Sequence, residues 1–261
     1  MDTQLPVSAF IIAKDEEDRI LKAINSVKDW VDEVIVVDSG STDRTVEIAK
    51  GAGAIVFFNE WDGYGNQKRF AEDQCRNDWL LNIDADEAVT PKLAQEMISL
   101  FTPAPEDDIY KVYIVDVFPH EKTAKDWAFG YWQYRLYNKG KGRFSESPVH
   151  DTVRPKEDVK LAKLSGRVDH YSQRSIQFSV EKLNRYSDMQ VADMIKRGRS
   201  VSSWRLLTEF PLAFFKSYFA RKAFLYGWWG VVVSVNYAFS RFIRIAKFYQ
   251  HQLIEASKAR N

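Results

Sequence analysis

The residues best suited to chemistry lie in a short acidic segment, residues 84–87, which directly follows the apolar run 79–83. That run has the length and composition of a buried strand. In an open α/β sheet, ligands bind at the carboxyl ends of the strands. Asp84 and Asp86 supply hard oxygen ligands, which suit Mg²⁺ or Mn²⁺. A polar loop that caps a helix at Thr90-Pro91 is the alternative, and the segment alone leaves both interpretations open.

A second polar segment, Asp38-Ser-Gly-Ser-Thr-Asp43, follows another apolar run, residues 34–37. The carboxylate of Asp38 suits a nucleoside, because it can accept hydrogen bonds from a ribose hydroxyl or a base N–H group. Ser39 and the hydroxyl side chains after it add further polar groups. Two strand ends that carry carboxylates can converge on one crevice.

Basic residues and later polar residues complete the set of candidates. Lys68 and Arg69 lie on a predicted helix and could add positive charge, although a solvated helix face is an equally good interpretation. Were the nucleoside ligand a sugar nucleotide that reacts with an alcohol, a general base would be needed to deprotonate the alcohol, and Asp151 is the first candidate for it and His150 the second. Both also fit an ordinary polar loop. His170 has the chemistry of a metal or phosphate ligand, with a core or surface histidine as the alternative.

The elements that must position these residues follow a βαβ order. The predicted strands are residues 7–13, 34–37, 55–58 and 79–83, and the predicted helices include 66–74 and 91–100. This order predicts right-handed crossovers and a mostly parallel sheet, hence an α/β fold. From Ile109 the loosely alternating pattern predicts a mixed or antiparallel extension, and a helical segment follows from Ile176 to Arg197.

Composition and charge separate the chain into two parts. Of the 261 residues, Cys75 is the sole cysteine, which excludes an internal disulfide and fits a reducing compartment. The net charge of +1 hides an asymmetry: residues 196–261 carry twelve lysines and arginines against two acids. We therefore predict domains at 1–199 and 200–261, with an anionic partner for the tail. The apolar run 6–13 lacks a preceding basic region and reads as a strand, not a signal peptide.

The tail itself predicts an interfacial helix. We expect a helix to begin near Pro211, at a first-turn position. Eighteen uncharged residues lie between Lys222 and Arg241, at the lower edge of the length needed to span a bilayer. Flanking cations and many aromatic residues favour a helix that lies on an anionic membrane surface. Packing of this run against the domain at 1–199 is the alternative. A nucleic-acid partner is disfavoured, because the cations lie in an apolar, tryptophan-rich segment.

Four motifs carry a resemblance to a known family. They are Asp38-Ser-Gly-Ser-Thr-Asp43, Asp84-Ala-Asp86-Glu87, Arg135-Leu-Tyr137 and Val149-His150-Asp151. In their order and spacing the chain resembles family 2 glycosyltransferases of the GT-A fold, and within them the bacterial lipopolysaccharide core β-glucosyltransferase group. The resemblance covers residues 7–170 well and the tail loosely. It implies a GT-A (Rossmann-like) sheet with a C-terminal helical, membrane-associating extension.

The resemblance also implies a role for each matching residue. The nucleotide-binding residues would be Asp38, Ser39, Lys68, Asp84 and Arg135. The ligands of a Mg²⁺ or Mn²⁺ ion would be Asp86, Asp84 and His170. The catalytic base would be Asp151, with His150 as the second candidate. Two departures stand out: relatives often have Glu where Asp151 lies, and often Asn where Arg69 lies.

The implied function is an inverting, metal-dependent transfer of a sugar from a nucleotide donor, expected to be UDP, to a hydroxyl of a lipid-linked saccharide. The expected location is cytoplasmic, peripheral on the inner face of the cytoplasmic membrane. Two alternatives remain at this point. One is a phosphatase like the haloacid dehalogenases, with Asp84 as nucleophile, although Glu87-Ala88 departs from the small residues usual there. The other is a non-catalytic membrane-associated scaffold.

Overall fold

The computed structural model describes residues 4–146 and 152–258, and its contacts divide the chain into two units. The first unit comprises residues 1–124 and 130–172, and the second comprises residues 125–129 and 173–261. The strands are β1 Leu5–Ala13, β2 Val31–Asp38, β3 Ile55–Phe58, β4 Trp79–Asn82, β5 Glu87–Val89, β6 Ile109–Asp116, β7 Gly130–Asn138, β8 Gly142–Phe144, β9 Val153–Pro155 and β10 Leu161–His170. The helices of the first unit are α1 Ile20–Asn25, α2 Thr45–Gly51, α3 Tyr64–Gln74 and α4 Pro91–Leu100.

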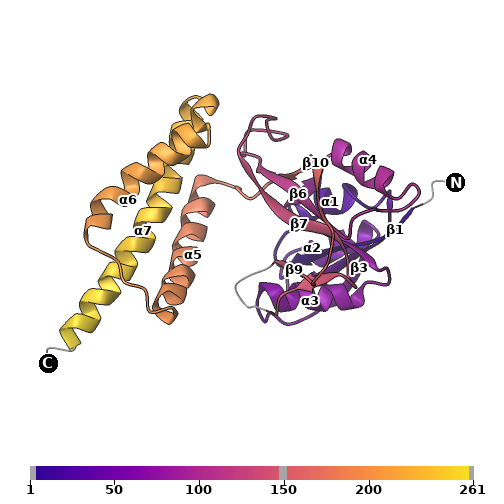
Figure 1. Ribbon diagram of the computed structural model, residues 1–261, viewed down its shortest axis with the longest axis horizontal. Helices are drawn as coiled ribbons and strands as arrows, with labels where there is room; N and C mark the ends of the chain where they lie inside the picture. The colour runs from indigo at the N-terminus through magenta and orange to yellow at the C-terminus, as the bar shows by residue number, and fades with distance from the viewer. Residues whose placement is uncertain (1–3, 147–151, 259–261) are drawn as a thin grey trace. The chain divides into compact units, whose positions relative to one another are not determined.

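The first unit is built on one eight-stranded sheet with the strand order β3-β2-β1-β4-β7-β6-β10-β5 (Figure 1). Strands β3, β2, β1 and β4 run parallel, as do β6 and β10. Strand β7 is antiparallel to both of its neighbours, and β5 is antiparallel to β10. The predicted mostly parallel α/β sheet is therefore confirmed, and of the two extensions expected after Ile109, mixed or antiparallel, the structure has the mixed one.

Strand β1 shows why its sequence is apolar at almost every position. Ala9 and Ile11 pack into a core on one face of the sheet, with residues of α1 and α4, whereas Phe10 packs on the other face with Ala71 of α3. A strand buried on both faces reads as a continuous apolar run. The helices that cover the two faces thus account for the uninterrupted apolar runs of the central strands.

Two local features fix helix α4. Thr90 is its N-cap, with Oγ1 accepting a hydrogen bond from the N–H of Leu93, and Pro91 occupies the first turn, as the sequence predicts. Gly166 of β10 lies against the helix so closely that a Cβ there would be 2.5 Å from the Cα of Leu93. This contact brings β10, and the histidine at its end, tightly onto the core.

The second unit is helical. Its elements are α5 Ile176–Lys196, α6 Trp204–Phe215, the π-helical turn η1 Lys216–Ala220, the 3₁₀ turn η2 Ala223–Tyr226 and α7 Trp228–Lys258. Met194 of α5 shares a core with Ile245 and Phe248 of α7. Because of this packing, the division between the units falls after Ser172, whereas the sequence-based boundary lies at 199/200.

The start of α6 corrects a prediction. The helix was expected to begin near Pro211, but it begins at Trp204 and contains Pro211 in its interior. A proline inside a helix lacks the N–H that would bond to the carbonyl four residues earlier. The carbonyl that loses this hydrogen bond belongs to Leu207, an exposed residue of α6. The π-helical turn η1 follows soon after.

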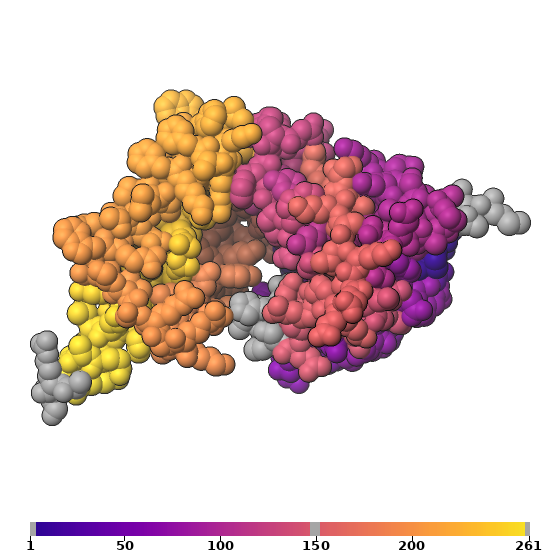
Figure 2. All heavy atoms as spheres, viewed as in Figure 1, coloured from indigo at the N-terminus to yellow at the C-terminus, as the bar shows by residue number. Residues whose placement is uncertain are grey.

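Small residues line the contact between α6–η1 and α7, and large apolar residues face outwards. Ser217 and Ser234 are buried, with their hydroxyl oxygens 3.2 Å apart, and Ala213 and Ala238 are buried in the same unit. We use the term apolar face for the exposed residues Trp204, Leu207, Leu212, Phe215, Phe219, Phe224, Leu225 and Trp228. Figure 2 shows the orange atoms of this stretch at the surface of the helical unit.

The uncharged run before Arg241 is not one continuous helix. Gly227, with φ +60°, separates η2 from α7. Within residues 4–146 and 152–258, no helix combines the length and apolar character that a membrane crossing requires.

Candidate active site

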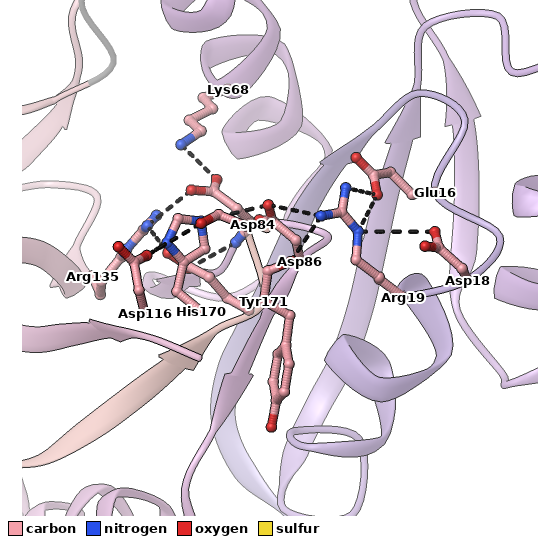
Figure 3. A network of polar contacts seen from close by, with 12 residues as sticks. Glu16, Asp18, Arg19, Lys68, Asp84, Asp86, Asp116, Arg135, His170 and Tyr171 are labelled. Atoms are coloured by element: carbon pink, nitrogen blue, oxygen red, sulfur yellow. Dashed lines mark hydrogen bonds and ion pairs between the residues drawn. The ribbon is translucent and has the colours of Figure 1, made fainter. Parts of the chain in front are cut away.

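The ends of three strands supply the acids and the histidine at the centre of the candidate active site (Figure 3). Asp84 and Asp86 lie in the turn between β4 and β5. Asp116 ends β6 and His170 ends β10, and these two residues are paired in the register of the parallel strands. The carboxyl ends of parallel strands are where open α/β sheets bind ligands. The fold therefore gathers acids and a histidine at the sheet edge expected from the sequence.

Asp84 is held between two cations. Its Oδ1 lies 2.8 Å from Nζ of Lys68, and its Oδ2 accepts a 2.9 Å hydrogen bond from Nη2 of Arg135. Burial alone would raise the pKa of Asp84, but the charges of Arg135 and Lys68 outweigh it and hold the pKa well below its ordinary value. Lys68 is only 1 % exposed. The alternative that Lys68 belongs to a solvated helix face is therefore wrong.

Arg135 also holds the turn between β4 and β5 in place through hydrogen bonds. It donates to Oε1 of Glu87 at 2.6 Å and to Oδ1 of Asn82, and Oε2 of Glu87 accepts from the N–H of Asp84 at 2.9 Å. Burial raises the pKa of Glu87. Arg135 is buried, and among the hydrogen bonds of the described residues its guanidinium donates only to side chains of residues 82–87. It fixes the geometry of the Asp84–Asp86 turn.

Asp86 faces His170 on one side and Arg19 on the other. Its Oδ2 is 3.4 Å from Nε2 of His170 and 3.3 Å from Nη1 of Arg19. Burial alone would raise the pKa of Asp86, but the hydrogen bond and charge of His170, aided by Arg19, lower it. Arg19 is anchored in turn by the carbonyl of Tyr171, at 2.9 Å.

His170 connects two carboxylates. Its Nδ1 is 2.8 Å from Oδ1 of Asp116, and its Nε2 is directed at Asp86. Burial alone would lower the pKa of His170, but the hydrogen bonds to Asp116 and Asp86 outweigh it and raise the pKa well above its ordinary value. With Nδ1 assigned to Asp116, Nε2 is the nitrogen that can serve as a ligand.

Asp38 and Ser39 lie at the same edge of the sheet, at the end of β2. Oδ2 of Asp38 accepts hydrogen bonds from the N–H groups of Gly40 and Ser41, and Oδ1 accepts from the hydroxyl of Ser41. A carboxylate has about four acceptor sites, so Asp38 keeps acceptor capacity beyond its own turn. The hydroxyl of Ser39 donates to the carbonyl of Ala13 and ties the turn to β1.

The two candidates for the general base, His150 and Asp151, lie outside the described residues. Their assignment stays a prediction from the sequence. The same holds for the nucleotide contacts assigned to Asp38, Ser39, Lys68, Asp84 and Arg135.

Three participants in the network escaped the sequence interpretation: Arg19, Asp116 and Glu87 in its buried role. Asp116 carried a usable signal, because it directly follows the apolar alternation of residues 109–115 and so ends a strand, as Asp84 nearly does. Arg19 carried none. It lies in an acidic turn, and its approach to Asp86 depends on how β1 and β4 pair.

The donor set at Asp86 and His170 suits a divalent cation. Two ligand atoms that share an ion at about 2.1 Å each are separated by roughly 3 to 3.5 Å, and Oδ2 of Asp86 and Nε2 of His170 are 3.4 Å apart. Across the described ranges, no group of three or more His, Cys, Asp or Glu residues is arranged to hold a metal ion. The participation of Asp84 as a third ligand therefore stays a prediction.

Comparisons with known proteins place this site in a family. The family model described as Glycosyl transferase family 2 matches residues 8–155. An uncharacterised glycosyltransferase of Rickettsia typhi is 42% identical over 98% of this chain and 89% of that protein. The lipopolysaccharide core biosynthesis glycosyltransferase LpsC of Rhizobium meliloti is 30% identical over 98% of this chain and 96% of its own length. The crystal structure of TarS from S. aureus is 13% identical over 94% of this chain and 83% of that one, with a TM-score of 0.48. The chain belongs to glycosyltransferase family 2.

Proposed function

We propose that this glycosyltransferase moves a sugar from a UDP donor, with a divalent cation, to a hydroxyl of a lipid-linked saccharide such as a lipopolysaccharide core. The observation that supports a nucleotide donor bound with a cation is the Asp86–His170 pair at the carboxyl edge of the sheet, whose 3.4 Å separation suits one shared Mg²⁺ or Mn²⁺ ion. Family membership sets aside the phosphatase and scaffold alternatives.

In this proposal Asp86 and His170 would hold the cation. When bound, the cation supplies positive charge that neutralises the departing diphosphate. In the neutral form that a cation requires, Nδ1–H of His170 would donate to Asp116, which leaves the lone pair of Nε2 for the cation. Asp116 is thus a positioning residue for the cation site.

The remaining candidates would bind the nucleotide and activate the acceptor. Asp38 would accept hydrogen bonds from the uridine, and Asp84, steadied by Lys68 and Arg135, would face the ribose. Asp151, with His150 as the second candidate, would take the proton of the acceptor hydroxyl as it attacks the sugar. A single displacement of this kind inverts the configuration at the anomeric carbon.

The proposed lipid-linked acceptor is inferred from a related protein. The name of the Rhizobium meliloti protein states a role in lipopolysaccharide core biosynthesis, and that protein matches this chain along almost all of its length. A lipid-linked acceptor is presented at a membrane, and the apolar face of the second unit supplies a surface that fits one. Trp228 is 89% exposed, and the exposed cations Lys216 and Lys222 lie among the apolar residues in the sequence. We therefore place the enzyme peripherally, at the inner face of the cytoplasmic membrane.

The donor proposal is tested by a transfer assay. The full chain is incubated with lipopolysaccharide truncated in the core and with UDP-glucose, UDP-galactose, UDP-N-acetylglucosamine or GDP-mannose, each with Mn²⁺ or with EDTA. We expect transfer from at least one UDP-sugar and none in EDTA. Transfer from GDP-mannose alone, or equal transfer in EDTA, would contradict the proposal.

The membrane proposal is tested by flotation with vesicles of phosphatidylcholine and phosphatidylglycerol. Phe215→Asp, on the apolar face, is expected to lower binding strongly. The matched control is Leu253→Asp, which places the same charge on an exposed apolar position near the end of α7. Equal losses in the two variants would argue against the apolar face as the contact surface.

A further inference from the structure

One carboxylate in the second unit is surrounded by three arginines. Nη2 of Arg205 is 2.6 Å from Oε2 of Glu209, and both Nε and Nη2 of Arg241 are 2.9 Å from Oε1. Nη2 of Arg244 lies 3.6 Å from the same Oε1. Arg205 and Glu209 lie one turn apart on α6, and the other two arginines lie on α7. We call these four residues the arginine cluster.

The cluster carries more positive charge than its carboxylate can neutralise. Among the described residues, Glu209 is the one acid within ion-pair distance of the three guanidinium groups, which leaves a surplus of two charges. Glu209 is buried, whereas the side chains of Arg205 and Arg241 are partly exposed, so an anion from solution can reach the surplus charge. Burial and the neighbouring guanidinium of Arg241 lower the pKa of Arg244, which reflects the same mutual repulsion.

Arg244 also lacks full hydrogen bonding. Its Nε is buried, and in the described part of the chain it has no hydrogen-bond partner. A buried donor without a partner is costly, and each such group in a folded protein calls for an explanation. An anion seated in the cluster would supply both the missing negative charge and an acceptor for this donor.

We propose that Arg205, Arg241 and Arg244 form a binding site for a phosphate-bearing anion, separate from the candidate active site. Planar guanidinium groups bind phosphate oxygens in pairs, which is why arginine is favoured where phosphate is recognised. Two sources share this chemistry, a phospholipid head group and a soluble phosphate or diphosphate. Trp204, next to Arg205 on α6 and 71% exposed, is suited to a membrane interface. The site does not depend on the proposed transfer reaction.

Replacing Glu209 should affect both stability and anion binding. Its carboxylate competes with an incoming anion for the same guanidinium donors. Replacement by glutamine keeps the shape of the side chain and raises the surplus to three charges. The Glu209→Gln variant should therefore be less stable without anion and should gain more stability from an anion than the wild type does. If Glu209 served only in an internal ion pair, the variant would lose stability and phosphate would restore none of it.

The test measures thermal unfolding of the full chain in sodium pyrophosphate and in sodium chloride of equal ionic strength. Alongside it, co-sedimentation uses phosphatidylcholine vesicles that contain either phosphatidic acid or oleic acid at matched surface charge. The variants are Arg244→Gln, Arg205→Gln and Glu209→Gln. The control is Arg197→Gln, which removes an exposed arginine that is paired with Asp193 in the same unit. Arg205→Gln serves if Arg244→Gln does not fold, because Arg205 is half-exposed.

Loss of one guanidinium contact is expected to weaken anion binding at least about tenfold, while Arg197→Gln stays near the wild type. A pyrophosphate-specific stabilisation that follows the cluster variants supports a soluble ligand. A phosphatidic acid preference that follows them supports a lipid head group. Equal behaviour of the wild type and the cluster variants in both assays, or an equal loss in Arg197→Gln, would overturn the proposal.

Discussion

At the sheet edge of the first unit, acids outnumber the basic side chains that they contact, whereas in the second unit three arginines surround a single carboxylate. The acids of the first site are Asp84, Asp86, Glu87 and Asp116, with Glu16 and Asp18 beside Arg19, and its bases are Arg19, Lys68, Arg135 and His170. This acid-rich network supports its own geometry and presents one histidine–carboxylate pair to a cation. The unbalanced cluster leaves a positive surplus, and its missing partner is an anion.

The largest effect is expected from breaking the buried ion pairs of the first site. Arg135→Met removes the buried charge that pairs with both Asp84 and Glu87. Removing one partner of a buried ion pair costs about 3–5 kcal/mol, because the other charge is left uncompensated. Urea unfolding of the full chain measures the loss. Arg44→Gln, at an exposed i,i+3 pair, is the control and should change stability by less than about 1 kcal/mol. Equal stabilities would show that Arg135 does not organise the turn.

An intermediate effect is expected from Asp116, which orients His170 without facing the cation itself. Asp116→Asn should weaken Mn²⁺ binding about 10- to 100-fold, as is typical when the partner of a metal-binding histidine is changed. Electron paramagnetic resonance of free Mn²⁺ in the presence of UDP reports the affinity. Asp78→Asn removes an exposed acid and should leave the affinity unchanged. An unchanged affinity in Asp116→Asn would mean that His170 is not a ligand.

The smallest effect is expected from the pH dependence of the second unit. Burial would raise the pKa of Glu209, but Arg205 and Arg241 outweigh it and lower the pKa below its ordinary value of 4.5. A lowered pKa means that the ion pairs stabilise fully above 4.5 and are lost as the pH falls below it. The stability difference between the wild type and Glu209→Gln should therefore shrink between about pH 5 and pH 3. A difference that stays constant over this range would contradict the shift.

The sequence predicted the parts of both regions that depend on local pattern. Apolar runs identified the buried strands, and the acids directly after residues 79–83 marked the edge of the site. Contacts between distant segments could not be read this way. Arg19 lies near Asp86 because β1 and β4 are paired in the sheet. Lys68 is buried because it lies on the face of α3 that packs against the rest of the first unit. Pro211 suggested a helix start, yet tertiary packing of the residues before it carried the helix across the proline.

The central claim is that Asp86 and His170 hold the cation on which donor binding depends. Mn²⁺ titration with UDP, followed by electron paramagnetic resonance, tests it directly with the full chain, Asp86→Asn and the control Asp78→Asn. We predict that the wild type and Asp78→Asn bind Mn²⁺ together with UDP, whereas Asp86→Asn loses this binding and remains folded by circular dichroism. Wild-type Mn²⁺ affinity in folded Asp86→Asn would contradict the claim.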